Sequence, residues 1–231
     1  MNKLCLCSAL FIPVLLQTAL AEKAVEENTI SYSAKYNSAS YDIIYLQADA
    51  TFALGDNFGF TVGANNLNLK FSDENDNAQN LRVGGFFRNP EHGRVELAYQ
   101  QLFNNGENDG LYSITGEYYF DNWTLGAYAM SDELSDLNDL NIYTNIYFTD
   151  NIRLEIDLLD ASDDSVVSAT VNFQAPDYIG NEWQLSLSYG EGFWDNDHQW
   201  GVGVKYTPDY NDTLKRFYRN YSTNIKSFFF L

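Results

Sequence analysis

A period-two alternation of apolar and polar residues constrains this chain more than any other feature of its sequence. In residues 111–120, Ser113, Thr115 and Glu117 share one parity, while apolar residues and one glycine occupy the other. Side chains of a β-strand point alternately to its two faces, so this segment has an apolar face and a polar face. The pattern returns between connectors rich in Asp, Asn, Gly and Ser, and it predicts an all-β chain of antiparallel strands.

Counting these segments as successive hairpins gives twelve strands, and ten strands preceded by an N-terminal extension is the alternative count. Within 58–70 the apolar positions change parity before Leu67 and Leu69, which predicts a β-bulge near Asn65 and Asn66. The expected strands are 29–36, 41–54, 58–70, 80–88, 94–103, 111–120, 123–131, 139–148, 152–160, 165–175, 183–191 and 198–206.

The composition limits what such strands can form. The chain has a formal net charge of −19, which disfavours nucleic acid as a partner, but 16% of its residues are aromatic, which is unlike a disordered chain. After residue 21 no apolar run is long enough for a membrane-spanning helix. Lipid contact is then possible only through strands closed into a barrel, because an open edge would leave backbone groups unpaired in hydrocarbon.

The connectors alternate between two kinds. Short turns at 55–57, 90–93, 121–122, 149–151 and 176–182 alternate with longer acidic segments at 72–79, 104–110, 131–139, 160–164 and 191–197. Short periplasmic turns and longer extracellular loops are typical of a transmembrane up-and-down barrel. Aromatic residues that resemble an interfacial girdle flank the short turns. They are Phe52, Phe58, Phe120, Trp123, Phe148, Phe173 and Trp183.

The first 21 residues have the layout of a cleavable secretory signal. Lys3 precedes an apolar run at 4–16, and the triplet Ala19-Leu20-Ala21 fits a cleavage site. A membrane anchor is the competing interpretation, but this run is interrupted by Pro13 and is shorter than the about 20 residues that a helical span needs. Cys5 and Cys7 fall inside the removed segment, so we expect no disulfide, zinc cluster or cysteine nucleophile in the mature chain.

The last expected strand carries a motif at Gln199, Gly201, Val204 and Tyr206. A polar residue, a glycine two positions later and alternating apolar residues ending in an aromatic resemble the assembly signal of Gram-negative outer-membrane β-barrels, which include the porins. The resemblance implies an outer-membrane location, with lipid, lipopolysaccharide, periplasmic chaperones and the barrel-assembly machinery as partners. It also implies three parts: a signal peptide at 1–21, a barrel at 22–207 and a tail at 208–231.

The tail departs from that family, whose barrels usually end at the motif's aromatic residue. It is basic, with Lys215, Arg216, Arg219 and Lys226, and it ends in three phenylalanines and a leucine. Three interpretations stay open: a periplasmic extension, a displaced final strand in which Phe230 takes the place of the terminal aromatic, or the product of an altered reading frame.

The polar faces of the expected strands collect charges of both signs that nearly cancel. If those faces look inward, they could form a charged constriction that selects solutes. The alternative is a set of ion pairs that fills a narrow barrel. These charges are Asp49, Arg82, Arg88, Arg94, Glu96, Glu117, Arg153, Glu155, Asp157 and Lys205.

We therefore expect a passive channel for small hydrophilic solutes, without a cofactor. The alternative is a closed structural or adhesive barrel whose acidic loops bind lipopolysaccharide or divalent ions. A barrel hydrolase is less favoured, since of the two histidines His92 lies in a turn and His198 has only Asp195 and Asp197 close in sequence. A soluble β-sandwich would also alternate, but its apolar faces would pack against each other.

Overall fold

The computed structural model describes residues 28–38, 42–70, 75–104, 107–131, 139–161, 164–191 and 198–220. The expected signal peptide at 1–21 and Phe230 lie outside these ranges, as do most of the acidic loop residues.

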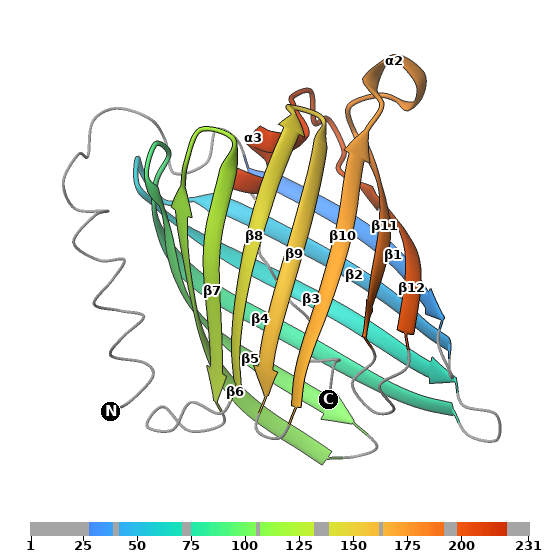
Figure 1. The fold of residues 1–231 in the computed structure, drawn as a ribbon. Coiled ribbons are helices and arrows are strands. Elements are labelled where there is room, and N and C mark those ends of the chain that lie inside the picture. The colour runs from blue at the N-terminus through green and yellow to red at the C-terminus, as the bar shows by residue number, and fades with distance from the viewer. Residues whose placement is uncertain are drawn as a thin grey trace.

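The strands form one closed antiparallel barrel in which each strand pairs with its neighbours in sequence and β1 pairs with β12 (Figure 1). The twelve-strand prediction is confirmed and the ten-strand alternative is wrong. The strands are β1 (Thr29–Ser38), β2 (Asp42–Ala53), β3 (Phe58–Lys70), β4 (Asn75–Asn89), β5 (Gly93–Asn104), β6 (Glu107–Tyr119), β7 (Trp123–Ser131), β8 (Asp139–Thr149), β9 (Ile152–Ala161), β10 (Asp164–Gln174), β11 (Trp183–Glu191) and β12 (His198–Tyr206).

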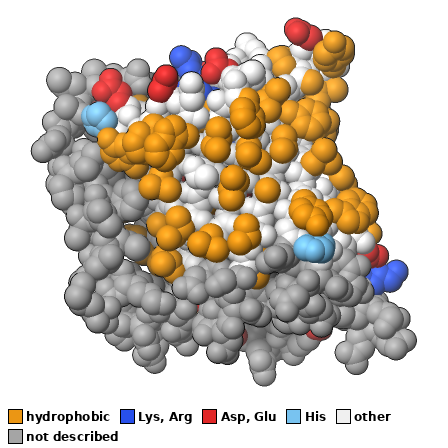
Figure 2. All heavy atoms as spheres, viewed as in Figure 1, with side chains coloured by type: hydrophobic (Ala, Val, Ile, Leu, Met, Phe, Trp, Pro, Cys, Tyr) orange, Lys and Arg blue, Asp and Glu red, His pale blue; other side chains and the backbone are white. Residues whose placement is uncertain are grey.

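The alternation decides which face of each strand looks outward. In β6 the polar parity is buried, as Ser113 and Glu117 show, whereas Leu97 and Leu125 on the neighbouring strands are 63% and 38% exposed. Figure 2 shows such apolar side chains spread over the outer face of the barrel. A water-soluble protein rarely exposes apolar surface on this scale. Among the described residues, all strands belong to the one barrel, and no second sheet covers them. The β-sandwich alternative is therefore wrong.

The predicted bulge in β3 is also wrong. Residues 59–70 of β3 pair with β2, and 58–70 pair with β4, both without a register shift. Leu67 is 2% exposed and faces inward, where it joins an apolar cluster with Ile43, Tyr128 and Tyr143. The apolar positions change parity because this part of the interior is apolar, not because the strand is irregular.

We call the end of the barrel from which the chain leaves β12 the tail end, and the opposite end the loop end. The tail-end connections are 54–57, 90–92, 120–122, 150–151 and 175–182. At the loop end, β4 and β6 begin inside the expected acidic loops. The connections before these two strands are therefore short, at 71–74 and 105–106. The two ends therefore differ less in the length of their connections than the sequence predicts.

Aromatic pairs mark the tail end on the outer face. Phe120 stacks on Trp123 with ring centroids 3.6 Å apart, and Trp183 packs against Tyr206 at 4.6 Å. Such rings suit the boundary between hydrocarbon and water.

Two short helices are described. α2 (Pro176–Ile179) lies in the β10–β11 connection, and α3 (Leu214–Asn220) follows β12. Within the described residues, no helix has the length and apolar character that a membrane span requires.

Candidate functional site

The candidate site is the barrel interior, because the expected charged residues all lie at inward-facing strand positions. Most of them are buried, while Glu155 and Lys205 are partly exposed. Lys35 of β1 has the same parity as the inward-facing Ser31, and the sequence reasoning missed it. Lys35 falls inside the expected strand 29–36, and the alternation with Ser31 and Ser33 is the signal that could have identified it.

Glu96 of β5 holds the central charge cluster. Its carboxylate lies 2.6 Å from the Arg82 guanidinium and also pairs with Arg94. The Thr61 hydroxyl donates a further hydrogen bond to it at 2.9 Å. All three charged side chains are at most 3% exposed, so they are packed on the inner face of β4 and β5.

Glu117 and Arg153 extend this packing around the barrel. The hydroxyls of Tyr143 and Tyr119 donate to the Glu117 carboxylate at 2.7 and 3.1 Å. Arg153 lies 3.1 Å from Glu155 in an ion pair, and its guanidinium also donates to the Asn145 side chain at 3.1 Å. We call the inner face of β4–β9, which carries these long side chains, the packed wall.

The inner face of β10, β11, β12 and β1 carries much smaller side chains, and we call it the small-residue wall. A Cβ atom added at Gly201 would lie 2.6 Å from the Ser188 hydroxyl, and one added at Gly203 would lie 2.5 Å from the Ser186 hydroxyl. Glycine and serine thus share this face. Ser168, Thr170, Ser186 and Ser188 are partly exposed, whereas most inward side chains of the packed wall are buried. Its inner members include Ser31, Ser33, Ser168, Thr170, Ser186, Ser188, Gly201 and Gly203.

Two lysines project from the small-residue wall. Lys35 of β1 and Lys205 of β12 lie two positions apart along the register, since Ser33 pairs with Lys205. Asp49 of β2, opposite Ser31, accepts a hydrogen bond from the Gln47 side chain at 2.6 Å. Charge on this wall is therefore sparse and local.

The motif expected to direct assembly lies on the strand that closes the barrel. Gln199 and Gly201 face inward and are buried, whereas Val204 and Tyr206 lie on the outer parity. The alternation thus separates the motif between the two faces of β12. Its recognition by an assembly machinery stays a prediction.

The tail does not form a displaced strand within the described residues, because β12 closes the barrel on β1 without it. Residues 207–213 turn back, and α3 lies in the tail-end mouth (Figure 1). Leu214 and Phe217 of α3 are 0% and 1% exposed, and Phe217 packs with Phe86 of the packed wall. The tail-end mouth therefore contains part of the chain's own tail.

The two histidines lie apart from the interior charges. His92 is in the β4–β5 turn, and His198 is exposed on the outer parity, where its ring stacks on Tyr189 with centroids 5.5 Å apart. Asp195 and Asp197 lie outside the described residues. Among the described residues, no group of three or more His, Cys, Asp or Glu side chains is placed to hold a metal ion.

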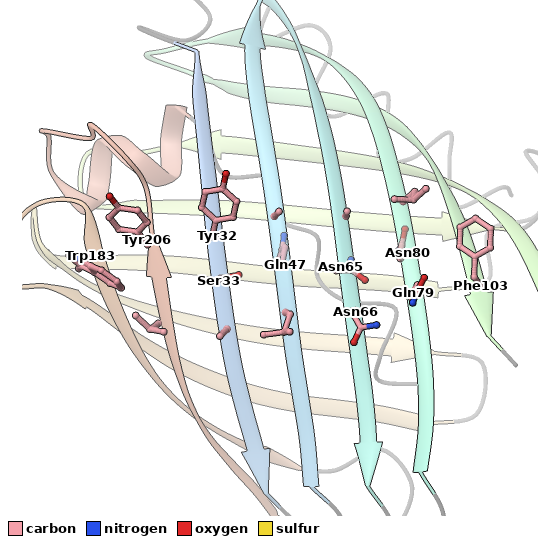
Figure 3. A pocket seen from close by; sticks show the side chains of 16 residues that line it. Tyr32, Ser33, Gln47, Asn65, Asn66, Gln79, Asn80, Phe103, Trp183 and Tyr206 are labelled. Atoms are coloured by element: carbon pink, nitrogen blue, oxygen red, sulfur yellow. The ribbon is translucent and has the colours of Figure 1, made fainter.

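A groove of about 800 Å³ lies on the outer wall of the barrel rather than in the interior (Figure 3). Ala34, Ala48 and Ala64 form its low floor, and rings such as Tyr32 and Trp183 stand at its side. Its outward alanines and rings belong to the apolar outer surface.

Comparison with known proteins agrees with this architecture. No protein-family model matches the sequence, and no curated protein matches it either. Among solved structures, a KdgM porin is similar with a TM-score of 0.59 and 12% identity, over 76% of this chain and 98% of that one. The dimeric outer membrane phospholipase of Salmonella typhi with bound calcium is similar with a TM-score of 0.55 and 11% identity, over 85% of this chain and 96% of that one.

At these identities the likeness shows the fold alone. The closed twelve-stranded barrel, its apolar outer face and its polar interior agree with that likeness. The chain therefore has the closed antiparallel barrel fold of these outer-membrane proteins.

Proposed function

We propose that the protein is a porin-like channel that admits small hydrophilic solutes passively across an outer membrane. One observation carries this proposal: inward side chains of the small-residue wall are partly exposed, whereas the long side chains of the packed wall are buried and largely bonded to one another. Space for water and solute then lies along β10, β11, β12 and β1. The similarity of the fold to KdgM porins, one of them in complex with disordered oligogalacturonate, supports a channel of this kind.

The charges along this path suggest a weak preference among solutes. Arg82, Arg94 and Arg153 have carboxylate partners on the packed wall, whereas Lys35 and Lys205 project from the small-residue wall. A solute moving along that wall meets the two ammonium groups and the nearby Asp49 carboxylate. We expect neutral solutes to pass freely and small anions to be favoured modestly over cations.

The test is conductance of the purified, folded protein in a planar bilayer. Because α3 lies in the tail-end mouth, the wild type is measured beside a full-length Phe217→Asp variant, which places a charge in that apolar contact. Current steps from either protein support the channel. Silence from both, when heat-modifiable migration shows that both are folded, rejects it.

A closed structural or adhesive barrel is the second candidate. The ion pairs of the packed wall and the helix in the mouth favour it, because both fill the interior. In this case the acidic loops would bind lipopolysaccharide or divalent ions at the cell surface. Binding of Mg²⁺ or lipopolysaccharide to folded protein that conducts no current would support this candidate.

Hydrolase activity is the least supported function, although one similar structure is a phospholipase. The His198 ring stacks on Tyr189 and lies on the outer face. If the barrel were a hydrolase of this kind, His198→Ala would abolish hydrolysis of phospholipid or peptide. Absence of any such activity in the wild type would exclude this function.

A further inference from the structure

We infer that the tail-end mouth is a binding site for a basic, aromatic peptide, and that residues 207–219 occupy it as a plug supplied by the chain itself. This inference rests on the proposed channel function, since a plug can reduce conductance only where the barrel has a passage. It identifies the kind of partner that the mouth accepts and the source of that partner.

The apolar part of the site anchors the helix. Leu214 and Phe217 are one turn apart on α3, so both side chains lie on the same face of the helix. The Phe217 ring meets the Tyr210 ring edge-on at 5.2 Å, and both belong to a cluster with Phe86 from the inner face of β4. The helix is therefore held against the interior of the barrel and not against its outer surface.

The turns of the tail end supply a polar rim that suits a cationic segment. The Arg219 guanidinium donates to the backbone carbonyls of Phe120 and Asp121 in the β6–β7 turn and of Trp123 at the start of β7. The Lys215 backbone N–H donates to the Asp150 carbonyl of the β8–β9 turn at 2.9 Å. Carbonyl groups at a turn need donors from outside the strand ladder, and the tail provides them.

The opposite side of the mouth holds the segment that leads into the helix. The Thr207 N–H donates to the Glu182 carbonyl at 2.9 Å, and the Gln174 side chain donates to the Asp212 carbonyl at 3.0 Å. Asn181 donates to the Asn211 side chain at 2.8 Å. Contacts from 207 to 219 therefore reach the β6–β7 and β8–β9 turns on one side and the β10–β11 connection on the other, so the segment crosses the mouth.

Charged groups of the interior contact the plug directly. The Arg153 guanidinium lies 3.2 Å from the centre of the Tyr218 ring, and the Lys205 ammonium lies 4.9 Å from that of Phe217. These cation–π contacts place the aromatic face of α3 above charges from both walls. Arg216 is on the other side of the helix, with its side chain 62% exposed and paired with Asp212.

The first experiment compares full-length variants in planar bilayers. Phe217→Asp removes the anchor, and Arg216→Ala is the matched control on the exposed side of the same helix. We expect Phe217→Asp to conduct several-fold more than the wild type and Arg216→Ala to match the wild type. Equal conductance of folded Phe217→Asp and wild type would overturn the plug.

The second experiment supplies the partner separately. A synthetic peptide of residues 207–231 is added to the Phe217→Asp channel from each side in turn. Addition at the tail end should lower the current towards the wild-type level, and addition at the loop end should leave it unchanged. If the peptide has no effect from the tail end, the mouth is not the binding site that we propose.

A third measurement does not depend on conductance or on folding of Phe217→Asp. In protein produced without residues 1–21, which contains no other cysteine, Leu214→Cys and Arg216→Cys are labelled with a water-soluble maleimide. Labelling should be fast at position 216 and strongly slowed at 214. Equal labelling at positions 214 and 216 contradicts the plug even if the channel conducts. If no folded variant conducts current while position 214 stays protected from the maleimide, the channel is contradicted and the bound helix is supported.

Discussion

The two walls of the interior have the same strand geometry but differ in the size and bonding of their inward side chains. The packed wall places arginine, glutamate and tyrosine side chains so that they bond to one another, as at Arg82, Glu96 and Arg94. The small-residue wall places serine and glycine at the equivalent inward positions, as at Ser188 and Gly201. Barrel diameter is set by the number of strands, so the distribution of side-chain volume decides where a passage can lie.

The largest expected effect is on stability, and it concerns the packed wall. Glu96→Ala leaves the Arg82 and Arg94 guanidinium groups buried without their shared carboxylate, which should cost about 3–5 kcal/mol of unfolding free energy. Ser188→Ala on the small-residue wall is the matched change and should cost about 1 kcal/mol or less. Urea unfolding in lipid vesicles measures both, and similar losses would remove the distinction between the walls.

The second effect is on conductance, and it concerns the small-residue wall. Ser33→Trp puts a large side chain beside Lys205 in the expected path, so it should lower the current several-fold in the Phe217→Asp background. Thr115→Val on the packed wall changes shape little and should leave the current unchanged. An unaltered current in folded Ser33→Trp would place the passage elsewhere.

The smallest effect is on charge selectivity. Lys35→Gln removes one ammonium group from the small-residue wall, so the reversal potential in a salt gradient should shift towards cation preference. Arg216→Gln lies on the exposed side of α3 and should leave the reversal potential unchanged. A shift of equal size in both variants would mean that selectivity is not set along this wall.

Much of this molecule could be predicted from sequence because period-two alternation reports which face of a strand is buried. It placed twelve strands correctly, and Glu117 and Arg153, which share the polar parity, are buried in the structure. It did not predict which charges meet, since Arg82 and Glu96 are brought together by pairing of β4 with β5 and by side-chain direction. Sequence spacing alone does not fix those distances.

Two other features were not predicted from the sequence, for different reasons. Leu67 suggested a bulge because apolar residues were expected only on the outer face, whereas the interior has its own apolar cluster. The tail helix is too short for a clear period, and its sequence cue is the one-turn spacing of Leu214 and Phe217 on either side of two basic residues. The position of this helix in the mouth depends on contacts with turns that are distant in sequence, such as 120–122.

Cysteine accessibility inside the open channel tests the central claim most directly. Ser33→Cys and Ser186→Cys on the small-residue wall, and Ser113→Cys on the packed wall, are exposed to a water-soluble thiol reagent in the Phe217→Asp background during current recording. We predict rapid modification with loss of current at 33 and 186, and protection at 113, which is 6% exposed in the wild type. Equal reactivity at all three positions, or faster reaction at 113, would contradict an interior divided into a packed wall and a water-lined wall.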